Sequence, residues 1–305
     1  MTLLWQLLAL FLLLAGIGFG IGQWVRPHAA TLTPAGRGLL LLVIATLIGG
    51  FIGSPFWWAD VRESFSWDLP PFASRMLAAA GWSYFAVAWL ALRRPSYRRI
   101  RLVLLLIFVY LAPLALAILL YHLDRFDFSA PITYGFFAIV IPMVLASAWY
   151  LLRQPRILPD NESENAQDNV RSTVVVQVWL LVVAFITGVW AFALLATDRG
   201  PVGLIWAWQG DLLSSRLIGV MLLTIALGSV YGFRYAESAR LMLVMIGVYS
   251  LGVTVAAAWG VLSGMPIRTL YAAVFSVFFL VTAVLLINER QPRVVASTPL
   301  RSTKR

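Results

Sequence analysis

Long apolar runs alternate with short polar connections along the chain. Each run approaches 20 residues, the length of α-helix that crosses a hydrocarbon core of roughly 30 Å. Because the apolar positions are continuous and are not confined to one helical face, they predict transmembrane helices. The nine predicted spans cover residues 3–21, 38–53, 72–92, 102–121, 131–152, 173–196, 217–233, 241–262 and 267–287.

The composition leads to the same class of protein. Hydrophobic residues make up 61% of the 305 residues and charged residues 12%, whereas soluble domains are roughly a quarter charged. We therefore predict an all-α, polytopic transmembrane helical bundle. The chain has no cysteine and only two histidines, His28 and His122. Cysteine and histidine are the usual ligands of zinc and redox centres, so we predict no metal site and no cofactor.

Basic residues concentrate in alternate connections. Most of the 23 Lys+Arg residues fall in segments 22–37, 93–101, 153–172, 234–240 and 288–305. The positive-inside rule predicts that these segments are cytoplasmic, which puts the N-terminus outside and the C-terminus inside. This distribution also accounts for the net charge of +10, so no nucleic-acid partner is expected. Glu237 lies between Arg234 and Arg240 and is expected to pair with them.

An internal repeat relates the two halves of the sequence. A shift of 141 positions brings pairs of identical residues together, namely Trp67 and Trp208, Ser74 and Ser215, Arg75 and Arg216, Arg93 and Arg234, and Arg99 and Arg240. A shift of 135 then superposes Pro131-Ile132 on Pro266-Ile267. These matches predict two tandem, parallel four-helix units with a pseudo-twofold axis along the membrane normal. The alternative is chance alignment of apolar helices that end in arginine.

The repeat divides the chain into five parts. Residues 1–36 form an N-terminal span with its cytoplasmic loop, residues 37–156 the first four-helix repeat and residues 171–288 the second. Between the repeats, residues 157–170 are rich in acidic and amide side chains, which predicts a solvated cytoplasmic linker. Residues 289–305 form a basic cytoplasmic tail.

Two arginines near the outer ends of predicted spans are candidate ligand-binding residues. Arg75 and Arg216 correspond in the repeat, and a guanidinium presents a planar fork to phosphate or carboxylate. We hypothesise that both face a shared cavity and hold an anionic head group, together with Trp67, Trp208, Asp68 and Asp211. The alternative is that each arginine reaches the membrane interface or pairs with Asp68 or Asp211, and that the tryptophans belong to an ordinary aromatic belt.

A second candidate site lies in the predicted outer loop before Pro131. His122, Asp124 and Asp127 fall within a few residues of one another, and a histidine beside carboxylates can move protons near neutral pH. These three residues are the candidate catalytic acid/base groups. The alternative is a short polar loop with an interfacial histidine, since no nucleophile accompanies them.

Two of these segments carry a family resemblance. Residues 67–75 (WDLPPFASR) and residues 122–128 (HLDRFDF) resemble segments of uncharacterised multi-spanning bacterial integral membrane proteins. The resemblance implies a location in the bacterial cytoplasmic (inner) membrane. It implies no activity and assigns no role to any residue.

Three functional hypotheses are compatible with these patterns. The leading one is a non-enzymatic binder or carrier of a lipid or other amphipathic molecule, with membrane lipids as its partners and a site between the repeats near the outer leaflet. The second is a structural or accessory subunit that packs against other membrane protein subunits. The third is an intramembrane lipid-modifying enzyme that uses His122, Asp124 and Asp127.

Overall fold

The computed structural model describes residues 2–28, 32–65, 67–153, 172–197, 212–265, 267 and 269–289. Every regular element in this part of the chain is helical. The long helices are α1 (Thr2–Gly20), α2 (Pro34–Trp58), α3 (Pro71–Arg93), α4 (Tyr97–Ala117), α5 (Pro131–Arg153), α7 (Val174–Ala196), α8 (Leu212–Arg234), α9 (Ala236–Leu262) and α10 (Thr269–Glu289). The short helices are η1 (Ile21–Val25), η2 (Arg26–His28), η3 (Arg62–Ser64), η4 (Ile118–His122) and η5 (Leu123–Arg125).

Local sequence signals set the helix ends. Prolines occupy the first position of α2, α3 and α5, where the missing N–H costs no intrahelical hydrogen bond. Thr33 caps α2 by accepting a hydrogen bond from the Gly36 N–H at 3.0 Å, and Ser96 caps α4 through the Arg99 N–H. After α2 the chain reverses at Asp60, whose φ of 56° is a left-handed conformation common at helix ends.

Among the residues that the structure describes, eight helices are long and apolar enough to cross a membrane, namely α2, α3, α4 with its continuation, α5, α7, α8, α9 and α10. The apolar part of the first helix that meets the same search, Phe11–Val25, is shorter. The structure therefore supports eight candidate spans, where the sequence predicted nine. Their number and composition are those of a multi-pass integral membrane protein.

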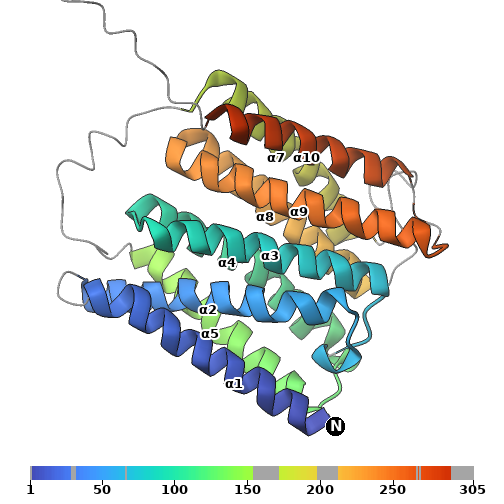
Figure 1. Cartoon of the computed structure of the whole chain (residues 1–305). Coiled ribbons are helices and arrows are strands. Elements are labelled where there is room, and N and C mark those ends of the chain that lie inside the picture. Colours follow the sequence, from blue (N-terminus) through green and yellow to red (C-terminus); the bar gives the residue numbers. More distant parts are fainter. Residues whose placement is uncertain are drawn as a thin grey trace, which may run out of the picture.

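The helices form a layered bundle (Figure 1). The four helices α3, α4, α8 and α9 lie in the middle, with α3 packed on α9 and α4 packed on α8. On one side α2 packs against α3 and α5 against α4, while on the other α7 packs against α8 and α10 against α9. Helix α1 lies outermost and packs on α2.

The two ends of the bundle differ in their connections. We call the end with the α2–α3 and α4–α5 connections the loop end, and the end with the tight α3–α4 and α8–α9 turns the turn end (Figure 1). The loop end is at the right of the figure and the turn end at the left. The candidate residues of the sequence analysis that the structure describes all belong to the loop end.

Small residues let helices approach closely inside the bundle. A Cβ atom added to Gly50 of α2 would collide with the backbone carbonyl oxygen of Gly81 of α3. Likewise, Gly252 of α9 lies directly against Ala79 of α3. Without a hydrophobic driving force between helices in lipid, such close backbone contact is a main source of helix association. It fixes the position of α3, whose first residues border the pocket described next.

Candidate functional site

A pocket of about 370 Å³ opens at the loop end. Its volume is within the usual range of small-molecule sites. The lining combines charged, aromatic and apolar side chains, namely Asp60, Arg62, Phe65, Trp67, Asp68, Leu69, Pro70, Pro71 and Arg125. Seven of these nine residues belong to the α2–α3 connection, Pro71 is the first residue of α3, and Arg125 comes from η5 on the α4–α5 connection.

The α2–α3 connection is held in shape by its own backbone. The carbonyl of Val61 accepts the Ser64 N–H at 3.0 Å, and the carbonyl of Arg62 accepts the Phe65 N–H at 3.1 Å, which forms the short helix η3. The Ser74 hydroxyl of α3 donates to the Trp57 carbonyl of α2. The pocket rim therefore connects two helix ends that are themselves bonded together.

Four charged side chains line the pocket without pairing with one another. Arg62, Asp68 and Arg125 are exposed, and Asp60 is half-buried. Within the described part of the chain, none of these four side chains makes a hydrogen bond or an ion pair. Two cations and two anions thus border one cavity, and all four remain able to bind a ligand.

Trp67 forms the aromatic wall of the pocket. Its ring lies 5.1 Å from that of Phe126 and 5.8 Å from that of Phe136, measured between centroids. Phe126 is buried, and the same apolar cluster includes Leu213 and Leu217 of α8. The Trp67 indole Nε1 is buried and has no hydrogen-bond partner among the described residues. This cluster connects the pocket to the middle of the bundle.

Arg216 contacts two residues of η4, the short helix that continues α4. Its Nη1 lies 2.6 Å from Nε2 of the buried His122. Its guanidinium carbon also lies 5.0 Å from the centre of the Tyr121 ring, within the range of a cation–π interaction. A half-buried arginine of α8 is therefore bound by two consecutive residues of η4.

Arg75 has a similar aromatic neighbour but no hydrogen-bond acceptor. Its guanidinium carbon lies 5.9 Å from the centre of the Trp259 ring of α9. Its Nη1 is buried and, among the described residues, has no hydrogen-bond partner. A buried guanidinium N–H without an acceptor is unfavourable. Arg75 is therefore able to accept an anionic ligand group, whereas Arg216 is already engaged.

The predicted ligand-binding residues are only partly brought together. Trp67 and Asp68 line the pocket, but Arg75 and Arg216 do not. The ion pair between Arg75 and Asp68, which was part of the alternative interpretation, does not form among the described residues, and Arg75 contacts Trp259 of α9 instead. Trp208 and Asp211 lie outside the described residues.

Of the predicted acid/base residues, His122 and Asp127 contact separate partners. His122 contacts Arg216, while Asp127 accepts hydrogen bonds from the Ser129 N–H at 2.8 Å and the Ser129 hydroxyl at 2.6 Å. These bonds lower the pKa of Asp127 below its ordinary value. Asp124 is exposed, and its side chain makes no hydrogen bond with the described residues. Asp127 thus acts as a turn residue before α5.

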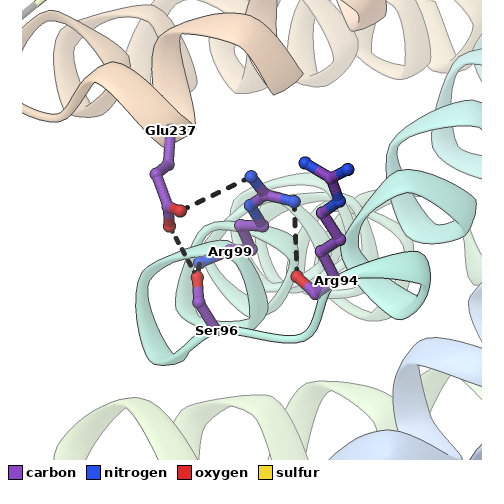
Figure 2. Close-up of polar contacts among 4 residues, drawn as sticks. All are labelled: Arg94, Ser96, Arg99 and Glu237. Atoms are coloured by element: carbon purple, nitrogen blue, oxygen red, sulfur yellow. Dashed lines mark hydrogen bonds and ion pairs between the residues drawn. The ribbon is translucent and has the colours of Figure 1, made fainter. Parts of the chain in front are cut away.

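At the turn end, Glu237 pairs with a different arginine than expected (Figure 2). Its Oε1 lies 3.4 Å from Arg99 Nη2, and the Ser96 hydroxyl donates to its Oε2 at 2.7 Å. Arg99 also donates to the Arg94 carbonyl at 3.3 Å. The predicted pairing with Arg234 and Arg240 is wrong, because α9 begins beside the N-terminus of α4, and that contact brings Arg99 to Glu237.

Three charged pocket residues were not among the sequence-based candidates, namely Asp60, Arg62 and Arg125. The available signal was the density of charges of both signs in the loops that precede Pro71 and Pro131. That signal does not show which charges share a cavity. Arg62 and Arg125 are far apart in the sequence, so their proximity becomes visible only when the fold places the α2–α3 and α4–α5 connections side by side.

Comparison with known proteins identifies no relative. No protein-family model matches the chain, and neither a search of curated proteins nor a search of solved structures finds a significant match. Function must therefore be argued from the site itself.

Proposed function

We propose that this integral membrane protein binds or carries a lipid or other amphipathic molecule, with the polar head group in the loop-end pocket. The observation that carries the proposal is the pocket of about 370 Å³ whose four charged side chains have no protein partner in the described part of the chain. A pocket with a few convergent polar groups is the default candidate for a binding site.

Apolar surface adjoins the charged pocket. Large exposed side chains occupy the same α4–α5 segment that contributes Arg125, namely Leu119, Leu120, Leu123 and Phe128. A ligand with a polar head in the pocket can place its acyl part against these side chains and the surrounding bilayer. This combination favours an amphipathic ligand over a small soluble ion.

Arg75 does not line the pocket and is proposed as a second, separate anion contact at the loop end. Its buried Nη1 lacks an acceptor, and a phosphate or carboxylate oxygen at the loop end would supply one. The proposed role of Arg216 is to hold the α4 end in place through His122 and Tyr121. The two arginines, although related in sequence, would therefore serve different purposes.

We further propose that the loop end faces the outside of a bacterial cytoplasmic membrane. At the turn end, the exposed arginines include Arg93, Arg94, Arg234 and Arg240, which supports a cytoplasmic position by the positive-inside rule. Because the chain has no cysteine, single cysteines report topology directly. Glu63→Cys should react with a membrane-impermeant maleimide in intact cells and Arg94→Cys only after permeabilisation. The opposite labelling would overturn this orientation.

The two four-helix units are proposed to descend from a duplication. Helices α3 and α8 both have 23 residues, and their first residues are 141 positions apart, as are Ser96 and Glu237, which bond to each other. Contact between corresponding positions is what a twofold axis between two copies produces. The crossed packing of α3 on α9 and α4 on α8 supports the same arrangement.

The ligand can be tested by mass spectrometry of amphiphiles that co-purify in native-lipid discs. The wild type is expected to retain a stoichiometric amphiphile, which Arg62→Gln/Arg125→Gln should lose and Arg75→Gln should retain less well. The matched control is Arg93→Gln/Arg94→Gln, which removes two exposed arginines from the turn end and should retain the ligand. Equal retention by all variants, or no specific amphiphile in the wild type, would contradict the proposal.

An accessory subunit remains the second candidate because α5 is barely buried. Only Thr133, Val140 and Ser147 of this helix are buried, and among the described helices it packs mainly on α4. A partner helix could cover the rest. In that case the same preparation would contain a stoichiometric membrane protein and no specific amphiphile.

A further inference from the structure

We infer that the loop-end pocket recognises a zwitterionic group, in which a phosphate or similar anion lies a few bonds from an amine. This inference rests on the proposed function, since it specifies the head group of the ligand. Its basis is the charge of the lining, which contains two arginines, Arg62 and Arg125, and two aspartates, Asp60 and Asp68.

A purely anionic ligand matches only half of this lining. Arg62 and Arg125 supply forked donors for phosphate oxygens, but a ligand with negative charge alone would meet the carboxylates of Asp60 and Asp68 in the same cavity. Like charges that face one another in one cavity repel. A purely cationic ligand meets the converse problem with the two guanidiniums.

A zwitterion satisfies both pairs at once. Its anionic centre binds the guanidiniums, and its ammonium binds the carboxylates. The pocket also offers the rings of Phe65 and Trp67, and aromatic faces attract ammonium groups. The four charged side chains form no ion pairs among themselves, so binding need not first break a salt bridge.

Two sources can supply this chemistry, a phospholipid head group or a water-soluble zwitterion. The apolar side chains next to Arg125 favour the lipid. We therefore design the test around phosphatidylethanolamine, with glycerophosphoethanolamine as its soluble counterpart. If only the soluble compound binds tightly, the pocket selects a zwitterion but its ligand is not a lipid.

The decisive comparison uses the wild-type chain and changes only the ligand. Detergent-purified protein is titrated with phosphatidylethanolamine, N-acetylated phosphatidylethanolamine and phosphatidylglycerol, and bound lipid is counted by native mass spectrometry. Acetylation removes the cationic centre and leaves the phosphate. We expect the unmodified lipid to bind about tenfold more tightly than either anionic lipid, a difference of about 1.4 kcal/mol.

Variants assign the two charges to their partners. Asp60→Asn/Asp68→Asn should weaken the unmodified lipid about tenfold and leave phosphatidylglycerol unchanged or tighter, whereas Arg62→Gln/Arg125→Gln should weaken all three lipids by a similar factor. Asparagine tolerates the left-handed backbone at position 60. Asp124→Asn, at an exposed position next to Arg125 in the sequence but outside the pocket lining, is the matched control and should change nothing.

Two results separate failure of this inference from failure of the proposed function. If the wild type binds phosphatidylglycerol or the acetylated lipid as tightly as phosphatidylethanolamine, the pocket binds amphiphiles but does not select a zwitterion. If the wild type binds none of the lipids and no soluble zwitterion, both proposals are wrong.

Discussion

Arg216 has only hydrogen-bond donors, so Nε2 of His122, 2.6 Å away, acts as the acceptor. This requires a neutral histidine ring with its proton on Nδ1. The Tyr121 ring covers the guanidinium from another direction. Two neighbouring side chains therefore compensate a charge near the end of a membrane helix, where an unpartnered cation is unfavourable.

Replacing His122 by alanine should destabilise the protein. The substitution leaves a half-buried guanidinium without its acceptor, which is expected to lower the free energy of unfolding by about 1–3 kcal/mol. Thermal unfolding in detergent measures the effect, and Asp124→Ala, at an exposed position of the same segment, is the control. Equal unfolding temperatures for wild type and His122→Ala would show that Arg216 does not depend on this bond.

The hydrogen bonds of Asp127 should make the thermal stability of the protein depend on pH. Hydrogen bonds from Ser129 lower the pKa of its carboxyl below the ordinary value of 3.8, so folding favours the ionised form. The resulting stabilisation is complete above that ordinary value and is lost as the pH falls through the lowered pKa. The difference in thermal stability between wild type and Asp127→Ala should therefore be constant from pH 5 to 8 and shrink near pH 3. A difference that grows on acidification would contradict this.

At the scale of elements, close contact between α2 and α3 positions the pocket. Gly50 and Gly81 allow the two helices to touch through their backbones, and the Ser54 hydroxyl, which donates to the Gly50 carbonyl at 2.6 Å, lies against Gly81. Because the α2–α3 connection supplies most of the pocket lining, any change in the distance between these helices should also reach the pocket.

Gly50→Ala tests this contact. The added methyl group collides with the backbone of α3, so the helices must separate, at a cost of about 1–3 kcal/mol. The neighbouring Gly49 has no atom within 4 Å of its would-be Cβ, and Gly49→Ala should be neutral or slightly stabilising. Thermal unfolding of the two variants provides the comparison. Similar unfolding temperatures for the two variants would show that the α2–α3 contact can accommodate a methyl group without cost.

Much of the helix architecture could be predicted from the sequence, and little of the pocket. The apolar runs and the prolines at positions 34, 71 and 131 are local signals, and they mark where α2, α3 and α5 begin. The proximity of Arg125 to Arg62, and of Glu237 to Arg99, depends on which helices are neighbours. The spacing of residues along the sequence does not show which helices are neighbours, so these contacts could be identified only from the structure.

For the whole molecule, the important contacts cross between the two halves. The α3–α9 and α4–α8 pairs join the first half to the second, and so do the contacts of Arg75 with Trp259 and of Arg216 with His122. The covalent connection between the halves mainly raises their local concentration. The halves should therefore recognise each other as separate chains.

A split protein tests this expectation. Residues 1–156 and 157–305, expressed together as separate chains, should co-purify and unfold together, because the crossed helix pairs remain intact. Either half expressed alone should be degraded or aggregate, since it exposes the helix surfaces that normally pack against the other half. Co-expressed halves that fail to associate would show that their packing depends on the intact chain.

The peripheral position of α10 gives the bundle a defined order of mechanical rupture. Among the described helices α10 packs mainly on α9, whereas α9 also contacts α3 and α8. Under a force applied to the C-terminal end, α10 would be extracted first and at low load. The next event would have to separate α9 from helices of both halves together, so the largest force peak would fall in the middle of the extraction and not at its start.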